Sequence, residues 1–179
     1  MHETVRRWLR GLFSEHPALF HGTRVLECGA LILPNNSTAA GFFADCDYTG
    51  LDATPGPGVD VVGLAHEYQP AEPFDVALST SMLEHDPHWQ RSVTHMIDML
   101  KPGGVLLLTF PAPGWPAHEV ACSPDGAYYR NLEAGDVLPL IEGRFDDVQV
   151  TPGRAPETFI LALGKRDAAP IESETKQRE

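Results

Sequence analysis

The stretch 24-RVLECGALILPNNSTAAGFFADCDYTGLD-52 determines the fold class of this sequence. It opens with a short apolar run that reaches Glu27 and Gly29, and it closes with a second short run that ends at Asp52. This order predicts a buried parallel strand, a glycine turn, a helix and a second strand. In an open parallel sheet, ligands bind beyond the carboxyl ends of the strands, where the strand order reverses. We therefore expect Gly29 and Asp52 to lie together at a ligand-binding edge.

The rest of the hydrophobic pattern alternates strands with helical segments. The expected strands are residues 23–28, 46–51, 59–63, 74–80 and 105–110. The segment FDVALST (74–80) is short and almost entirely apolar, which is typical of a central strand buried on both faces. Such alternation predicts right-handed crossovers and a parallel sheet. Two last strand-like runs, FDDVQV and ETFILALG, flank PGRAP and predict a closing antiparallel hairpin.

Four helical segments are expected between these strands. They are residues 3–15, a short segment that carries Phe42 and Phe43, a segment from Asp86 to the KPGG motif, and residues 132–141. The first is amphipathic and should pack on the sheet or cover part of the ligand edge. Asn36 or Ser37 can cap the second. Asp86 followed by Pro87 is a typical helix start, with Asp as the cap and Pro at the first helical position.

The charge balance restricts the class of partner. The chain has 13 Lys and Arg against 25 Asp and Glu, a formal net charge of -12. This charge opposes loose binding to nucleic acid or to an anionic membrane surface. Small molecules, proteins or uncharged glycans are the expected partners.

Cysteine usage and the N-terminus predict a cytoplasmic, soluble protein. Cys28, Cys46 and Cys122 are odd in number and widely spaced, so we expect buried, reduced thiols. The first residues lack the apolar centre of a signal peptide, and no run reaches the ~18 apolar residues of a membrane span.

The expected organisation is one domain at residues 23–166, preceded by a helix and linker at 1–22 and followed by a polar tail at 167–179. Residues 111–125 are rich in Pro and Gly and show no period. A long irregular segment in a compact domain is usually functional, so we interpret it as a substrate loop.

The motifs RVLECG, GLD, VDVV, FDVALST, MLEH and LKPGG occur in the order found in a known family. From residue 24 to residue 110 the chain resembles the class I S-adenosylmethionine-dependent methyltransferases, with weaker support from YYRNL (128–132). The resemblance implies a Rossmann-like, doubly wound, mostly parallel α/β sheet with a C-terminal antiparallel hairpin. It also implies S-adenosylmethionine as cofactor and a methyl transfer to a small-molecule or glycan-like acceptor.

The resemblance also implies positions for the cofactor. The matching residues are Glu27, Gly29, Ala30, Asp52, Ala53, Ala65, His66, Ser79, Thr80 and Met82. Glu27 and Gly29 match the motif that approaches the methionine part of the cofactor, and Asp52 matches the acidic residue that accepts hydrogen bonds from the ribose hydroxyls. Ala53, Ala65 and His66 fall beside the adenine, and the segment 79–82 borders the methyl group.

Two features depart from the family pattern, the glycine run and residue 64. GALIL keeps only Gly29 of a run of alternating glycines, so the side chains of Leu31 and Ile32 can narrow the cofactor space. Leu64 stands where related sequences often place an Asp that bonds the adenine amino group. Losing one charged hydrogen bond weakens binding by about tenfold to a hundredfold.

Methyl transfer requires mainly alignment, which can lower a barrier by about 7 to 11 kcal/mol. A positioned base adds about 10² to 10⁴ in rate when the acceptor starts protonated. His85 is the first candidate for this base, and the alternative is that it bonds backbone at a helix entry. His118 is a second candidate. Tyr128, Tyr129 and Arg130 line an acceptor site or form a packed surface corner.

Alternatives remain for other polar residues. Asp52 can instead cap the Pro-Gly turn that follows it, and Glu27 can instead satisfy nearby backbone donors. Glu84, His85, Asp86 and His88 have metal-binding side chains, but their spacing fits no zinc signature, so no metal is expected.

Two other functions compete with an active methyltransferase. One is a methyltransferase-like scaffold that no longer catalyses and binds a protein partner, which the eroded glycine run motivates. The other is a nicotinamide-dependent oxidoreductase, because an acidic end to the second strand also suits NAD. The absence of a GxGxxG turn argues against the latter.

Overall fold

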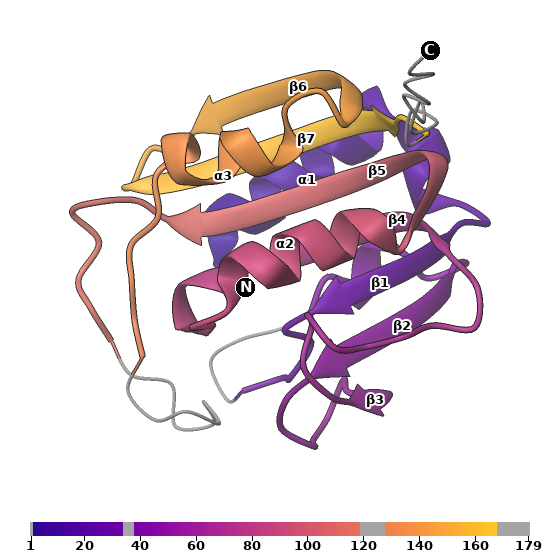
Figure 1. Ribbon diagram of the computed structural model, residues 1–179, viewed down its shortest axis with the longest axis horizontal. Coiled ribbons are helices and arrows are strands. Elements are labelled where there is room, and N and C mark those ends of the chain that lie inside the picture. The colour runs from indigo at the N-terminus through magenta and orange to yellow at the C-terminus, as the bar shows by residue number, and fades with distance from the viewer. Residues whose placement is uncertain (1, 34–37, 119–127, 168–179) are drawn as a thin grey trace, which may run out of the picture.

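The computed structural model describes residues 2–33, 38–118 and 128–167. These residues contain a seven-stranded sheet in the order β3-β2-β1-β4-β5-β7-β6 (Figure 1). The strands are β1 (Arg24–Cys28), β2 (Asp47–Asp52), β3 (Val61–Val62), β4 (Phe74–Thr80), β5 (Leu100–Pro111), β6 (Phe145–Pro152) and β7 (Glu157–Lys165). The first five pair in parallel, whereas β7 runs antiparallel to both β5 and β6. The predicted fold class is confirmed.

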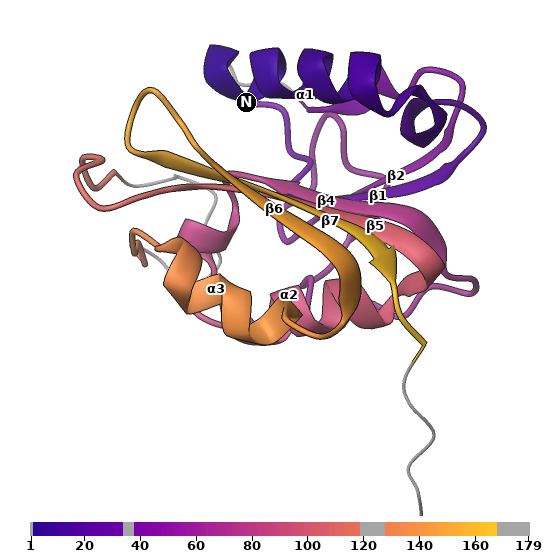
Figure 2. The same cartoon turned by 90° about the horizontal axis from the view of Figure 1, so that it is seen from above.

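Helices cover both faces of the sheet (Figure 2). On one face lies α1 (Glu3–Glu15), which buries Val5, Leu9 and Leu12 against it. On the other lie α2 (Trp89–Asp98) and α3 (Ala134–Ile141). The spacing that predicted an amphipathic α1 therefore also predicted its role in packing on the sheet. The central strand β4 is buried at nearly every position, as its apolar run indicated.

The crossover from β1 to β2 contains less helix than the sequence predicted. Its described part holds one 3-10 turn, η2 (Ala40–Phe42), and Asn36 and Ser37 lie outside the described residues. Phe43 is nevertheless buried in the α1-side core. Only eight residues separate Thr38 from the start of β2, which leaves room for little more than this turn.

The helix α2 begins later than predicted. Its first residue is Trp89, and Asp86 lies three positions before it. The Asp86 side chain accepts a hydrogen bond from the His88 amide at 2.7 Å, and the Asp86 carbonyl accepts one from the Trp89 amide. Asp86 and Pro87 therefore form a turn that leads into the helix, so the predicted cap position was wrong by two residues.

The KPGG motif belongs to β5 and not to the end of α2. The strand spans Leu100–Pro111, and its pairing with β4 shifts register between Phe74 and Val76. Gly103 has a φ of +77°, a left-handed conformation that favours glycine. The glycines thus form an irregularity inside the strand, which carries the chain directly from the helix into the central sheet.

In the described part of the chain, no helix is long and apolar enough to cross a membrane. Cys28 is buried with a free thiol, and Cys46 is partly buried with a free thiol. Cys122 lies outside the described residues.

Candidate active site

Strand order places the predicted site residues at the edge of the sheet formed by the carboxyl ends of its parallel strands. The parallel strands β2, β1 and β4 are neighbours, so their carboxyl ends lie side by side, and the arrowheads of β1 and β5 in Figure 1 point to this edge. Asp52 ends β2, Gly29 follows β1, and Thr80 ends β4. The edge is also where the strand order reverses, the usual position of a ligand in such sheets.

Gly29 allows a close approach between two loops at this edge. Its φ is +88°, and a Cβ atom at this position would lie 2.5 Å from the Cβ of Met82. The Gly29 amide donates a hydrogen bond to the Leu51 carbonyl at 2.9 Å. Any other residue would suffer both backbone strain and a clash, so the first glycine of the motif is structurally required.

Asp52 is fixed by backbone donors. Its Oδ2 accepts a hydrogen bond from the Leu31 amide at 3.1 Å, and its Oδ1 accepts one from the Thr54 amide at 2.9 Å. The carboxylate therefore caps the turn after β2, as one of the two alternatives predicted. A carboxylate oxygen has two lone pairs, so each oxygen keeps one acceptor position. Asp52 is partly exposed and can use these positions for a ligand.

The bulky residues of the glycine loop lie against the turn after β2. Leu31 places its Cδ1 2.4 Å from where a Cβ of Gly56 would lie, and Ile32 places its Cγ1 3.0 Å from the corresponding point of Gly58. The Ile32 amide also donates to the Pro57 carbonyl at 2.9 Å. The glycines missing from the first loop are thus matched by glycines in the facing turn, which accommodate the larger side chains.

Glu27 connects three elements from a buried position. Its carboxyl accepts hydrogen bonds from the Ala39 amide of the crossover, from the Tyr48 hydroxyl on β2 and from the Thr80 hydroxyl on β4. Burial raises the pKa of Glu27 to about 7, and these hydrogen bonds act in the opposite direction. Glu27 therefore satisfies a buried backbone donor, the alternative role considered for it, and also holds the crossover to the strand ends.

The segment expected beside the adenine packs on α2. His66 is buried, and its ring centroid lies 4.7 Å from that of His88 at the start of the helix. Its Nδ1 has no hydrogen-bond partner among the described residues. Ala65 is buried, whereas Ala53 is partly exposed directly after Asp52. This segment therefore contains one buried ring nitrogen without a partner among the described residues.

The end of β4 contains a feature that the sequence did not reveal. Ser81 has a φ of +59°, in the left-handed region that non-glycine residues rarely adopt. This bend carries the chain from Thr80 to Met82, whose side chain lies over Gly29. Ser79 is buried, and its Oγ has no partner among the described residues.

Three predicted acceptor residues come together as a ring cluster, which we define as His85, His118 and Tyr129. The ring centroids lie 5.0 Å apart for the two histidines, 5.3 Å for His85 and Tyr129, and 4.9 Å for His118 and Tyr129. Burial lowers the pKa of His85 to about 4; His118 acts in the same direction and the Tyr128 carbonyl acts against it. His85 is therefore neutral at pH 7, and its buried Nδ1 has no partner in the described part of the chain.

One buried glutamate, Glu84, lies next to this cluster, and a second, Glu157, lies near enough to Glu84 to affect its charge. Sequence reasoning did not select either as part of an acceptor site. Glu84 is 1% exposed and places its Oε1 3.9 Å from the Nε2 of His85. Burial raises the pKa of Glu84 to about 8, and the charge of Glu157 adds to the increase. Glu157 is 6% exposed and begins β7. The only signal in the sequence was an acidic residue between Leu83 and His85.

The remaining predicted acceptor residues are arranged differently. Arg130 forms an ion pair with Asp136 at 2.9 Å, and its guanidinium lies 5.7 Å from the centroid of the Trp89 ring. These contacts are those of a packed surface corner, the alternative considered for this segment. Tyr128 is partly exposed.

The acidic and histidine residues from Glu84 to His88 have different partners. Glu84 and His85 lie at the ring cluster, Asp86 caps the start of α2, and His88 packs on His66. Among the residues that the structure describes, no three His, Cys, Asp or Glu side chains are arranged to hold a metal ion.

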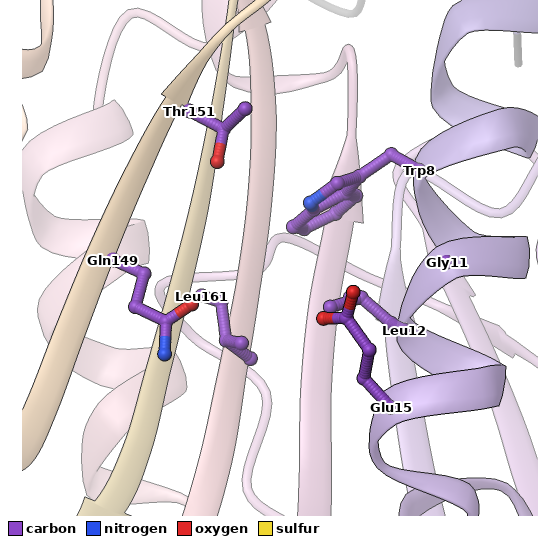
Figure 3. Close-up of a pocket in the computed structure, with 7 residues that line it drawn as sticks. All are labelled: Trp8, Gly11, Leu12, Glu15, Gln149, Thr151 and Leu161. Carbon is purple, nitrogen blue, oxygen red and sulfur yellow. The ribbon is translucent and has the colours of Figure 1, made fainter.

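A pocket also occurs on the α1 face, away from all of these residues. It is lined by Trp8, Gly11, Leu12, Glu15, Gln149, Thr151 and Leu161. Figure 3 shows the residues of α1 on one side and those of β6 and β7 on the other. None of the predicted cofactor or acceptor residues lines it, so it plays no part in the site at the strand ends.

The strand order and the polar residues at the edge define a class I methyltransferase fold. Residues 1–137 match the family model described as "Methyltransferase domain", and the chain belongs to this family. A comparison with curated proteins gives no match.

Solved structures support the fold. The 1,6-didemethyltoxoflavin-N1-methyltransferase of Burkholderia thailandensis, with bound 1,6-didemethyltoxoflavin and S-adenosylhomocysteine, is 19% identical to this chain with a TM-score of 0.65. The match covers 92% of this chain and 79% of that one. The sugar N-methyltransferase KedS8 of Streptoalloteichus sp ATCC 53650 is 14% identical with a TM-score of 0.63, covering 90% and 86%. The [4+2]-cyclase SpnF is 14% identical with a TM-score of 0.60, covering 91% and 82%. The first of these holds the demethylated form of the cofactor that the sequence resemblance implied, and the last shows that the fold alone does not determine the reaction.

Proposed function

We propose that the protein is an S-adenosylmethionine-dependent methyltransferase that acts on a small-molecule or glycan-like acceptor. The observation that carries this proposal is the carboxylate of Asp52, which two backbone amides fix beside Gly29 at the switch point of the sheet. Membership of a methyltransferase family supports it. The similar structures named for a toxoflavin precursor and for a sugar support the acceptor class.

The residues at the edge fit this cofactor. Each oxygen of Asp52 keeps an acceptor position, which suits the two adjacent hydroxyls of a ribose. Buried, unpaired polar atoms of Ser79 and His66 provide further positions for hydrogen bonds. Leu31 and Ile32, the residues that replace glycines, contact the facing turn, and Ile32 is 41% exposed. Their side chains therefore do not form a buried plug at the strand ends.

When bound, S-adenosylmethionine supplies a methyl group activated by a positively charged sulfur. The chain positions the reactants, since alignment is the main requirement of this reaction. Asp52 accepts hydrogen bonds from the ribose, and Gly29, Ala30 and Glu27 shape and brace the loop beside the methionine part. Met82 covers this loop at Gly29.

The residues on the remaining strand ends divide between the cofactor and the acceptor. Ala53, Ala65 and His66 border the adenine, whereas Ser79 and Thr80 border the methionine part. His85 is neutral and has an unpaired Nδ1, so it can accept a hydrogen bond from the acceptor group. His118 and Tyr129 complete the ring cluster around the acceptor, and Tyr128 and Arg130 form its outer margin.

Calorimetric titration with S-adenosylhomocysteine tests this proposal. We expect measurable binding and an increase in melting temperature. Asp52→Asn should weaken binding about tenfold to a hundredfold, because it removes a charged acceptor. Asp47→Asn is the matched control, since Asp47 is an exposed carboxylate at the opposite end of β2. Equal affinities of the two variants would contradict the role of Asp52.

A second candidate is a methyltransferase-like scaffold that binds a protein partner without catalysis. The contact between Met82 and Gly29 favours it, because this side chain lies directly over the loop that faces the cofactor in the family. The same titration separates the two functions. An unchanged melting temperature at millimolar S-adenosylhomocysteine would support the scaffold and count against the enzyme.

A further inference from the structure

Two buried glutamates, Glu84 beside the ring cluster and Glu157 near Glu84, lie where three strands meet. Glu84 belongs to η3 (Leu83–His85), which follows β4 directly, and Glu157 is the first residue of β7. The antiparallel register pairs Glu157 with Pro111 at the end of β5. Topology therefore brings two carboxyl groups, far apart in sequence, to the side of the edge where the acceptor is expected.

Each of these glutamates has an unpaired oxygen. The Oε2 atoms of Glu84 and Glu157 are buried and have no hydrogen-bond partner in the described residues. Buried polar groups without partners are uncommon because burial removes their water without replacement. Two such groups at one place indicate that their natural partner is a ligand.

Within the described part of the chain, no Lys or Arg neutralises this pair. The ion pairs within the described ranges include none between Lys or Arg and either glutamate. Arg130 follows Tyr129 of the ring cluster, but its guanidinium is paired with Asp136. The missing partner is therefore a hydrogen-bond donor, and a positive charge would suit it best.

The ring cluster is a second feature that suits a positively charged ligand. Its three rings lie 4.9–5.3 Å apart and are mutually tilted or edge-on. The face of the Tyr129 ring attracts cations, and an ammonium group gains from lying against it. His85, which connects the cluster to Glu84, is neutral and does not repel a positive charge.

We propose that Glu84 and Glu157 bind the nitrogen of an amine acceptor as its ammonium form, beside the rings of His85, His118 and Tyr129. This inference rests on the proposed function and narrows the acceptor class to amines. An ammonium group donates three hydrogen bonds, which matches the two free carboxyl oxygens and the unpaired Nδ1 of His85.

Glu84 can also convert the bound ammonium group into a nucleophile. An ammonium nitrogen has no free electron pair, so one N–H bond must break before the nitrogen can act as a nucleophile. The electron pair stays on nitrogen, and the proton bonds to the Glu84 carboxylate. A base works best when its pKa lies near the working pH. With no ligand bound, burial raises the pKa of Glu84 to about 8, so this carboxyl group holds a proton at neutral pH. A bound ammonium group favours the ionised form of Glu84. The pKa of His85 is lowered to about 4, so the ionised Glu84 is the better proton acceptor.

Binding of matched amines and alcohols to the full chain tests the inference. The pairs are benzylamine with benzyl alcohol, glucosamine with glucose, and ethylamine with ethanol, each titrated by calorimetry with and without saturating S-adenosylhomocysteine. We expect at least one amine to bind about tenfold or more tightly than its alcohol, as a charged hydrogen bond contributes. Failure of every amine to exceed its alcohol would overturn the inference.

Variants locate the effect. Glu84→Gln and Glu157→Gln should each reduce amine affinity by about tenfold and leave the alcohol and S-adenosylhomocysteine unchanged. Asp146→Asn, which alters an exposed carboxylate paired with Arg166, should change nothing. A Glu84→Gln variant that keeps the full preference for amines would refute the assignment. The titrations without S-adenosylhomocysteine test amine binding separately from the proposed function. The proposed function is contradicted if the wild-type protein does not bind S-adenosylhomocysteine, whereas the amine inference is contradicted by the amine titrations alone.

Discussion

Carboxyl groups have different surroundings on the two sides of the strand edge, at the ends of β1 and β2 and at the ends of β4 and β5. At the ends of β1 and β2, Glu27 and Asp52 are held by hydrogen bonds from neighbouring elements. At the ends of β4 and β5, Glu84 and Glu157 are more deeply buried than Asp52 and have unpaired oxygens. On the first side both carboxyl groups have hydrogen-bond partners within the chain, whereas on the second side each glutamate keeps one oxygen without a partner among the described residues.

This difference separates two uses of a buried or half-buried acid. A satisfied carboxyl stabilises the fold and fixes a loop, so its removal should cost stability. An unsatisfied one costs stability and is expected at a binding site, so its neutral replacement should stabilise the protein. Stability measurements can therefore test the comparison without any knowledge of the acceptor.

The largest effect is expected at the loop on the first side. Gly29→Ala should lower the free energy of unfolding by about 3 to 5 kcal/mol, because it adds a clash with Met82 to the strain of a positive φ. Gly103→Ala is the control, since Gly103 also has a positive φ but an added Cβ meets nothing within 4 Å. It should cost about 1 kcal/mol. Equal losses in urea denaturation would show that the approach of Met82 is not tight.

On the second side, Glu84→Gln should stabilise the protein at high pH. The pKa of Glu84 is raised from 4.5 to about 8 in the folded protein. Between these values the folded protein holds a proton that the unfolded chain has lost, so wild-type stability falls as the pH rises through this window. The variant avoids this loss and should gain on the order of 3 kcal/mol over the wild type between pH 5 and pH 8.

Urea denaturation at several pH values measures this gain. Asp146→Asn should show no comparable trend, because its carboxylate is exposed. A constant difference between Glu84→Gln and the wild type from pH 5 to pH 8 would mean that Glu84 is not an unsatisfied buried acid.

Tyr48→Phe should have the opposite sign, because it removes a donor from the satisfied Glu27. We expect a loss of about 2 kcal/mol, the cost of leaving a buried carboxyl group one partner short. The loss should increase above pH 7, where Glu27 begins to ionise. Tyr68→Phe, in a ring that is only partly buried in the core, should change stability by less than about 0.5 kcal/mol. A neutral or stabilising Tyr48→Phe would remove the distinction between the two sides.

Local patterns in the sequence were sufficient for the architecture. The uniform apolar run of β4 and the turn residues between β6 and β7 identified a buried parallel centre and an antiparallel end. The same patterns brought Gly29 and Asp52 to one edge, because carboxyl ends of neighbouring parallel strands coincide. The predicted ends of helices were less accurate where a side chain binds nearby backbone. The Asp86 side chain accepts a hydrogen bond from the His88 amide and so forms a turn before α2.

The acceptor side could be predicted only in part. His85, His118 and Tyr129 were selected individually, but their contact depends on how the loop after β5 folds back. Glu157 lies 73 positions after Glu84, and only the register of β5 with β7 brings them together. The sequence also gave no sign of the left-handed Ser81, since serine has no preference for that conformation.

The smallest expected effect is on the pH dependence of stability and concerns His85. It tests whether the ring cluster is shielded from water to the extent that its burial indicates. The pKa of His85 is lowered from 6.5 to about 4, so the unfolded chain takes up a proton in this range before the folded protein does. Wild-type stability should therefore fall as the pH drops below 6.5, and His85→Asn should reduce this fall by about 1 kcal/mol at pH 5.5. His21→Asn, at an exposed histidine paired with Asp45, should have a smaller effect. Glu84 and His85 change the free energy of unfolding with pH in opposite directions. The double variant should therefore show a flatter dependence of this free energy on pH, both above and below pH 7. A dependence that stays steep would mean that other titrating groups cause it.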